Sequence, residues 1–165
     1  MDIRSVRLED LQSLAALAES TWLDTFSDGL TAADVDAALS ERDFDYFLKA
    51  IPQHSIFVAV VGEVLAGFIE CIGEKDVVTI DKLYVANAFQ GQGIGRALMT
   101  HLVSDPNFSS AAMQLDVWIE NTTAISLYQS FGFEVYAERP FISANGDVLS
   151  PDLLMRREPK SGLRQ

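Results

Sequence analysis

The sequence predicts one mixed α/β or α+β domain, in which helices cover the faces of a mixed sheet. Three observations predict this class. The chain has 165 residues, of which 48% are hydrophobic and 22% charged, so it can bury a core without disulfides. Apolar residues recur at helical spacing near the start and at alternate positions in the middle. Strands and helices then follow one another in a mixed order, which favours a layered fold.

The first elements are a short strand and a helix-rich segment. Residues 2–6 alternate as a strand does, and residues 9–26 place apolar side chains about 3.6 positions apart. Thr31 is typical of a helix N-cap, and Asp34 three residues later completes a variant of the capping box. A third short helix is expected over residues 44–51.

The remaining two thirds of the chain contain most of the predicted strands. These are residues 55–61, 64–72, 77–85, 112–118, 133–138 and 149–156, and the helices between them are residues 94–103 and 122–131. A turn at Asn145-Gly146 joins the last two strands. We expect residues 1–158 to form the single domain and residues 159–165 a loose tail.

Charge and composition narrow the class of partner. The chain has 12 basic and 24 acidic residues, a net charge of −12, which makes generic nucleic-acid binding an unfavourable interpretation. Residues 1–50 hold 11 of the acidic and 4 of the basic side chains. This segment is either a solvated surface or a region that attracts a cationic partner.

Other features of the sequence favour a cytoplasmic location. The single cysteine, Cys71, excludes an internal disulfide and lies in an apolar strand, so we expect a buried thiol. The first residues lack the apolar run of a signal peptide, and no apolar stretch approaches the roughly 20 residues that span a bilayer. We therefore expect a soluble protein without a membrane partner.

The most informative stretch is a strand that runs into a glycine-rich turn and then into a helix. Residues 90–96 read Gln-Gly-Gln-Gly-Ile-Gly-Arg and follow the strand 77–85. Glycines let the backbone approach a ligand, and the free N–H groups of a helix N-terminus attract phosphates. The spacing matches neither the dinucleotide fingerprint nor the P-loop. Taken alone, the pattern also fits a purely structural turn.

Two motifs in order resemble the GNAT acetyltransferase superfamily. Gln-x-x-Gly-x-Gly at residues 90–95 is similar to the family's pyrophosphate motif, Arg/Gln-x-x-Gly-x-Gly/Ala. Asn-x-x-Ala-x-x-x-Tyr-x-x-x-Gly-Phe at residues 121–133 resembles a second family motif. The resemblance covers residues 2–157. It implies a mostly antiparallel sheet of about six or seven strands, splayed between the fourth and fifth, with about four helices.

The resemblance implies acetyl-CoA as co-substrate and no metal. Pantetheine would lie between the splayed strands, along Leu83, Tyr84 and Val85. Asn121 would contact the pantetheine arm, although it can also simply cap the following helix. Tyr128 would protonate the departing thiolate, and the alternative is a core tyrosine with a satisfied hydroxyl. The turn and helix start would hold the pyrophosphate through Gln90, Gly91, Gln92, Gly93, Ile94, Gly95 and Arg96.

The acceptor amine must lose a proton before it attacks. At an ordinary pKa of about 10.4, this deprotonation costs roughly 4–5 kcal/mol at pH 7. Asp81, two residues before Leu83 and on the same strand face, is the first candidate base, and Glu70 is the second. Either can instead be an ordinary ion-paired carboxylate, with water as the base. His54 and His101 stand apart from the motifs, and we expect no base or metal role for them.

The acceptor site is implied by the resemblance to lie against the first two helices, which carry much of the negative charge. Trp22 and Phe26 would line it, or would simply pack in the core. Residues 21–26 and 80–85 are also similar to bacterial spermine/spermidine acetyltransferases. The leading hypothesis is therefore N-acetylation of a polyamine or similar small amine. The rivals are acetylation of a protein N-terminus or lysine, and a non-catalytic acetyl-CoA sensor. Homodimers are common in the family, but no interface is evident in the sequence.

Overall fold

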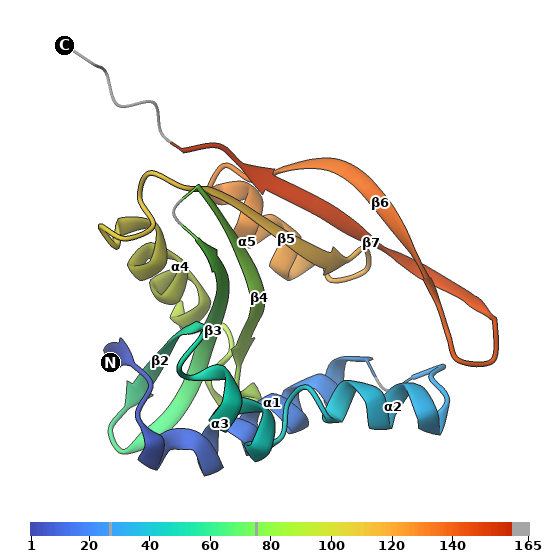
Figure 1. The fold of residues 1–165 in the computed structure, drawn as a ribbon, viewed down its shortest axis with the longest axis horizontal. Coiled ribbons are helices and arrows are strands. Elements are labelled where there is room, and N and C mark those ends of the chain that lie inside the picture. The colour runs from blue at the N-terminus through green and yellow to red at the C-terminus, as the bar shows by residue number, and fades with distance from the viewer. Residues whose placement is uncertain (27, 75, 160–165) are drawn as a thin grey trace.

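The computed structural model describes residues 1–26, 28–74 and 76–159 (Figure 1). Of the predicted tail only Pro159 is among them, and residues 160–165 lie outside the described residues. The elements are β1 (Asp2–Ser5), α1 (Leu11–Phe26), α2 (Ala32–Leu39), α3 (Phe44–Ala50), β2 (Ser55–Val61), β3 (Val64–Glu74), β4 (Val77–Val85), α4 (Ile94–Ser104), β5 (Ala112–Trp118), α5 (Thr122–Ser130), β6 (Glu134–Ile142) and β7 (Val148–Arg157). Two short 3-10 helices, Leu8–Asp10 and Asn87–Phe89, precede α1 and α4.

The strands form one mixed sheet in the order β1-β2-β3-β4-β5-β7-β6. All neighbours pair antiparallel except β4 and β5, which are parallel. Their pairing is confined to Val77–Ile80 against Ala112–Leu115, and beyond it the two strands diverge (Figure 1). The predicted mixed fold, with its splay between the fourth and fifth strands, is confirmed. The described residues form five α-helices, one more than expected.

Helices cover both faces of the sheet and create two core clusters. On one face α1 and α3 pack on β2 and β3 through Leu14, Phe47 and Phe68, all fully buried. On the other face α4 and α5 pack on the central strands, with Leu98 and Met113 at the centre. Cys71 is buried in this second cluster, as predicted. Side chains from both faces of the sheet meet where β4 and β5 diverge.

The helix ends follow their local sequence. Thr31 Oγ1 accepts a hydrogen bond from the Asp34 N–H at 3.2 Å, and Asp34 accepts one from the Thr31 N–H at 2.9 Å, which confirms the capping box. Asn121 caps α5 by accepting from the Ala124 N–H. Gly93, with φ of 80°, is the N-cap of α4, a conformation that only glycine adopts freely.

The C-terminal hairpin differs from prediction in its length. β6 continues to Ile142 instead of ending at Glu138, and its turn includes Gly146. The hairpin extends over α2 (Figure 1), where the Ala144 N–H donates to Asp34 Oδ1 at 2.8 Å. α2 and the tip of the hairpin are therefore in contact. No helix in the described ranges is long and apolar enough to cross a bilayer.

Candidate active site

A cleft of about 960 Å³ lies where β4 and β5 diverge. Its walls come from α1, the α2 region, the two strands, α5 and the β6–β7 hairpin. Acidic side chains dominate its charged lining, seven against three basic ones. The acids are Asp28, Asp34, Glu41, Asp81, Asp116, Glu120 and Asp152, and the bases are Arg42, Lys82 and Arg139. Such a lining attracts cations.

Tyr128 lines this cleft from α5 and is 7% exposed. None of the described residues exchanges a hydrogen bond with its hydroxyl, yet no fully buried side-chain polar atom among them lacks a partner. The hydroxyl therefore reaches the cleft. Burial raises the pKa of Tyr128 above its ordinary value, and the proximity of Tyr84 adds to this effect. The phenol keeps its proton at neutral pH and can donate it.

β4 carries a β-bulge beside the cleft. Glu70 pairs with Lys82 and the next residue of β3 pairs with Ile80, so Asp81 is an extra residue. A bulge interrupts the alternation of side chains along a strand. The Asp81 carboxylate consequently lies beside the Lys82 ammonium, while Leu83 packs against the α4 and α5 cluster. The expectation that Asp81 and Leu83 share one strand face is wrong for this reason.

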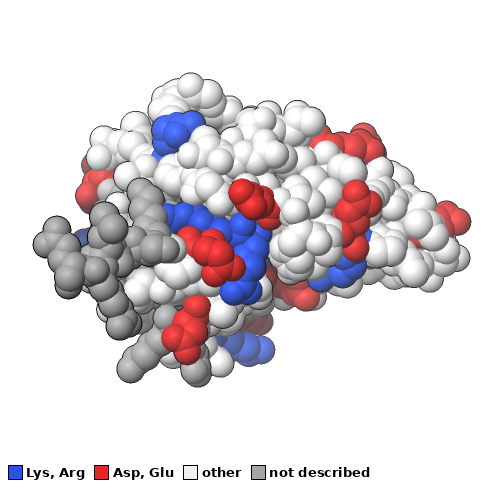
Figure 2. All heavy atoms as spheres, turned by 90° about the horizontal axis from the view of Figure 1, so that it is seen from above, with Lys and Arg blue, Asp and Glu red and all other residues white. Residues whose placement is uncertain are grey.

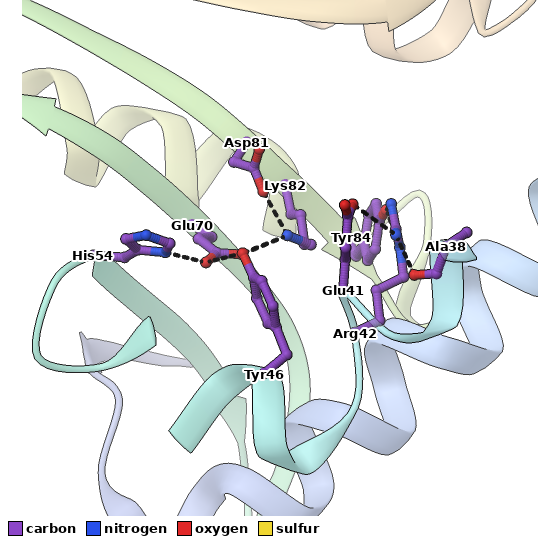
Figure 3. Close-up of polar contacts among 9 residues, drawn as sticks. All are labelled: Ala38, Glu41, Arg42, Tyr46, His54, Glu70, Asp81, Lys82 and Tyr84. Carbon is purple, nitrogen blue, oxygen red and sulfur yellow. Dashed lines mark hydrogen bonds and ion pairs between the residues drawn. The ribbon is translucent and has the colours of Figure 1, made fainter. Parts of the chain in front are cut away.

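Lys82 is the centre of a buried polar cluster (Figure 3). Its Nζ donates to Glu70 Oε2 at 2.9 Å, to Asp81 Oδ2 at 2.5 Å and to the Tyr46 hydroxyl at 3.0 Å. His54 Nδ1 lies 2.7 Å from Glu70 Oε1. Burial alone would lower the pKa of Lys82, but the carboxylates of Glu70 and Asp81 outweigh it and raise the pKa. Lys82 is a fully neutralised cation.

Glu70 is fully buried and is not part of the cleft lining. Its carboxylate accepts from the Tyr46 hydroxyl at 2.9 Å as well as from Lys82. Burial raises the pKa of Tyr46 to about 12. Of the two predicted bases only Asp81 therefore reaches the cleft, and Glu70 touches the site only through Lys82.

Arg42, in the segment after α2, forms a different kind of contact (Figure 3). Its Nε and Nη2 both donate to the Tyr84 hydroxyl, at 3.1 and 3.0 Å, and its Nη1 donates to the Ala38 carbonyl at 2.6 Å. The guanidinium also lies over the Trp22 ring, 5.3 Å from its centre. The carboxylate paired with it, from Glu41, is 4.0 Å away. Arg42 therefore carries a largely uncompensated charge into the cleft.

Arg139 is the third cation and the most exposed of the three. It pairs with Asp116 of β5 and with Asp152 of β7. Burial raises the pKa of Asp152, and the neighbouring Asp116 adds to this effect. In the middle of the face shown in Figure 2, acidic and basic side chains lie next to one another.

The glycine turn lies outside this cleft lining. The Gln90 side chain donates to the Val85 carbonyl and to Asn87, which holds the turn against the end of β4. The first helical bond of α4 is from the Ala97 N–H to Gly93, so the preceding N–H groups of the helix are free of helical partners. Such N–H groups are suited to an anion. Contact of these residues with a coenzyme stays a prediction.

The structure brings most other predicted residues to the cleft. Trp22, Phe26, Leu83, Tyr84 and Asn121 all line it, and Trp22 is also buried in the core. The predicted cap and core interpretations are therefore correct for Asn121 and Trp22, without excluding a binding role. Sequence reasoning missed the charged lining residues Arg42, Lys82, Asp116, Arg139 and Asp152. Among the described residues, no group of three or more His, Cys, Asp or Glu is arranged to hold a metal.

Comparisons with known proteins agree with this geometry. A family model described as an acetyltransferase (GNAT) domain matches residues 52–135. The [ribosomal protein bS18]-alanine N-acetyltransferase of Escherichia coli (strain K12) is 39% identical over 59 residues, 35% of this chain and 40% of that protein. An uncharacterised protein of Mycobacterium leprae (strain TN) is 39% identical over 80 residues, 48% of this chain and 21% of that protein. The matched segments thus span less than half of either curated relative.

Solved structures match the fold over almost the whole chain. PaiA N-acetyltransferase from Thermoplasma acidophilum, in complex with coenzyme A, has a TM-score of 0.78 at 20% identity and covers 95% of this chain and 98% of its own. YncA from Salmonella typhimurium, with its cofactor acetyl-CoA, has a TM-score of 0.73 at 21% identity and covers 100% and 97%. The structures show the shared fold, and the family model covers half of the sequence. The chain belongs to the GNAT acetyltransferase family.

Proposed function

We propose that residues 1–158 act as a single acetyl-CoA-dependent N-acetyltransferase domain whose acceptor is a cationic primary amine. The observation that carries the proposal is the cleft itself, in which seven carboxylates surround a path to the Tyr128 hydroxyl. Alkylammonium groups are attracted to such a lining, whereas anionic acceptors are repelled. The remaining task of the site is to deprotonate the bound amine.

The structure fits the donor substrate at two places. From Asp81 to Val85 no strand among the described residues pairs with the β5-facing edge of β4, so backbone groups there can bind an extended pantetheine arm. The free N–H groups at the start of α4 suit its pyrophosphate, and Arg96 is exposed beside them. The short-range attraction of these groups offsets the repulsion between coenzyme A and an acidic protein.

The chemistry is a direct transfer in a ternary complex. Acetyl-CoA supplies the acetyl group as a thioester. Coenzyme A leaves as the free thiol. Asp81, directly or through water, takes one proton from the acceptor ammonium. The nitrogen lone pair then forms the N–C bond as the C–S bond breaks. Tyr128 gives its proton to the sulfur and regains one from the acylated nitrogen, so one proton is released in each turnover.

Two classes of acceptor have a positive charge that complements the acidic cleft lining. The charge of the lining supports a polyamine such as spermidine. The name of one curated relative, [ribosomal protein bS18]-alanine N-acetyltransferase, favours an alanine of a protein. Both acceptors are primary amines that are cationic at neutral pH.

The test is release of coenzyme A thiol from acetyl-CoA with polyamines, amino acids and peptides that begin with alanine. We expect saturable release that weakens as salt is added, because salt screens the acidic lining. The Tyr128→Phe variant is the control, since it should bind coenzyme A normally and turn over slowly. Binding of acetyl-CoA without transfer to any acceptor would contradict the proposal and indicate a sensor.

A further inference from the structure

Arg42 and Tyr84 form a corner of the cleft, which we call the Arg42–Tyr84 corner. Its polar groups can donate hydrogen bonds to a ligand but have no free lone pair to accept one. The Tyr84 hydroxyl accepts from Arg42 Nε at 3.1 Å and from Nη2 at 3.0 Å, which uses both lone pairs of its oxygen. Its own proton has no acceptor among the described residues. A guanidinium has N–H donors only. The Arg42–Tyr84 corner therefore suits an oxygen with lone pairs and does not suit an ammonium.

The charge of Arg42 strengthens this preference. Its side chain is only 12% exposed, and the nearest carboxylate paired with it is 4.0 Å away. Buried charges are normally paired at hydrogen-bond distance. Arg42 makes its short contacts with a hydroxyl and a carbonyl, Tyr84 and Ala38, which leave the positive charge in place. Two of its five N–H groups remain for a ligand.

The corner lies on the side of the cleft that faces the first helices. Tyr84 packs against the α1 and α3 cluster, edge-on to Phe68. Tyr128 instead belongs to the cluster formed with α4 and α5. The two tyrosines thus approach the cleft from opposite faces of the sheet. Tyr128 serves the leaving group under the proposed function, so Tyr84 and Arg42 are left to face the acceptor.

We propose that the Arg42–Tyr84 corner binds a carboxylate or carbonyl oxygen of the acceptor, which is therefore an amine that also carries such an oxygen. The inference rests on the proposed function and specifies its substrate class. Carboxylates elsewhere in the cleft, such as Asp81 and Asp116, attract the ammonium end. The corner receives the oxygen end, so a dipolar amine fits both halves of the lining. A polyamine leaves the corner without a partner.

The test compares amines that differ only by a carboxylate. Lysine and cadaverine form one such pair, and ornithine and putrescine form another. With the full chain we expect kcat/KM to be about 10- to 100-fold higher for the amino acid than for its decarboxylated partner, as for a charge-assisted hydrogen bond. The kcat/KM for alaninamide, which has a neutral carbonyl, should lie between the values for the amino acids and those for their decarboxylated partners.

The variant that decides the question is Tyr84→Phe, which removes one hydroxyl and keeps the ring packed. It should lower kcat/KM for lysine about 10-fold, a larger factor than for cadaverine. Arg42→Gln should reduce the preference for lysine further and should favour cadaverine by removing a repulsive charge. Arg156→Gln is the matched control, because Arg156 pairs with Glu158 and does not line the cleft.

A binding measurement separates this inference from the proposed function. Both tryptophans of the chain, Trp22 and Trp118, line the cleft, so their fluorescence reports an acceptor without turnover. If the protein transfers no acetyl group but binds lysine, and Tyr84→Phe weakens that binding, the result would support the oxygen-binding role of the corner. It would at the same time overturn the proposed acetyltransferase activity. Equal loss with lysine and cadaverine in Tyr84→Phe would overturn the corner. So would a wild-type preference for cadaverine.

Discussion

Lys82 and Arg42 are two buried cations that reach the same cleft, and their surroundings differ. The Lys82 side chain is 2% exposed, and its ammonium contacts the carboxylates of Glu70 and Asp81. The Arg42 side chain is 12% exposed, and its short contacts are to uncharged oxygens of Tyr84 and Ala38. Lys82 is neutralised by the protein itself. The hydrogen bonds of Arg42 fix the position of its guanidinium but do not neutralise its charge. This is expected of a residue that binds an oxygen of a ligand.

Removing Lys82 should have the largest effect on stability. Lys82→Met leaves the buried carboxylate of Glu70 without its cation, which should lower the free energy of unfolding by about 3–5 kcal/mol. Arg42→Gln leaves no carboxylate stranded and should cost only about 1–2 kcal/mol, from lost packing and hydrogen bonds. Urea denaturation of the two variants measures the difference.

A double variant is the control for this interpretation. Glu70→Gln combined with Lys82→Met removes both buried charges, so most of the lost stability should return. A double variant as unstable as Lys82→Met alone would show that packing, and not the stranded charge, explains the loss.

Kinetic measurements on variants of Tyr128 and Tyr84 distinguish the roles of these two residues. Tyr128→Phe should lower kcat at least about 100-fold with every acceptor, equivalent to roughly 2.7 kcal/mol in the barrier. Its effect on coenzyme A affinity should be small, because the other proposed contacts of the coenzyme, at the edge of β4 and the start of α4, are unchanged. Tyr84→Phe should act mainly through the KM of carboxylated amines. An unchanged kcat in Tyr128→Phe would remove the proton donor from the mechanism.

The sequence predicts what depends on local interactions. The capping box of Thr31 and Asp34, and the glycine-rich turn that leads into α4, each depend on a few neighbouring residues. The helix expected over residues 122–131 is present as α5, with Asn121 as its N-cap and Tyr128 within it. These features were predicted correctly because chain neighbours determine them.

The charged lining depends on contacts that no local pattern encodes. Arg42 meets Tyr84 from 42 positions away, and Lys82 meets Glu70 across a strand pair whose register depends on the bulge at Asp81. Strict alternation therefore assigned Asp81 to the wrong face. The one available signal for Arg42 was its position, since it is one of four basic residues among the first 50.

Single charges of opposite sign in the cleft should shift acceptor preference in opposite directions. Asp116→Asn removes one carboxylate and should lower kcat/KM for putrescine about 3- to 10-fold at low salt, with the effect fading as salt is added. Arg42→Gln should raise it by a smaller factor. Glu63→Gln, in the exposed turn between β2 and β3, is the control and should leave kcat/KM for putrescine the same as in the wild type, at low and at high salt. Equal effects at low and high salt would show that steric fit, and not charge, explains them.

The smallest expected effect concerns Asp152, one of two carboxylates that share Arg139. Burial raises its pKa in the folded chain, so the folded state binds the proton more tightly than the unfolded state. The contribution of this group to stability is therefore greatest at acidic pH and is lost as the pH rises through the folded pKa. Asp152→Asn should consequently be more stable than the wild type at pH 7, by less than about 1 kcal/mol. The difference should shrink towards pH 4, as urea denaturation at both pH values would show. A variant less stable than wild type at pH 7 would mean that the ion pair with Arg139 outweighs burial, and that this exposed cation, like Lys82, serves mainly to neutralise its carboxylates.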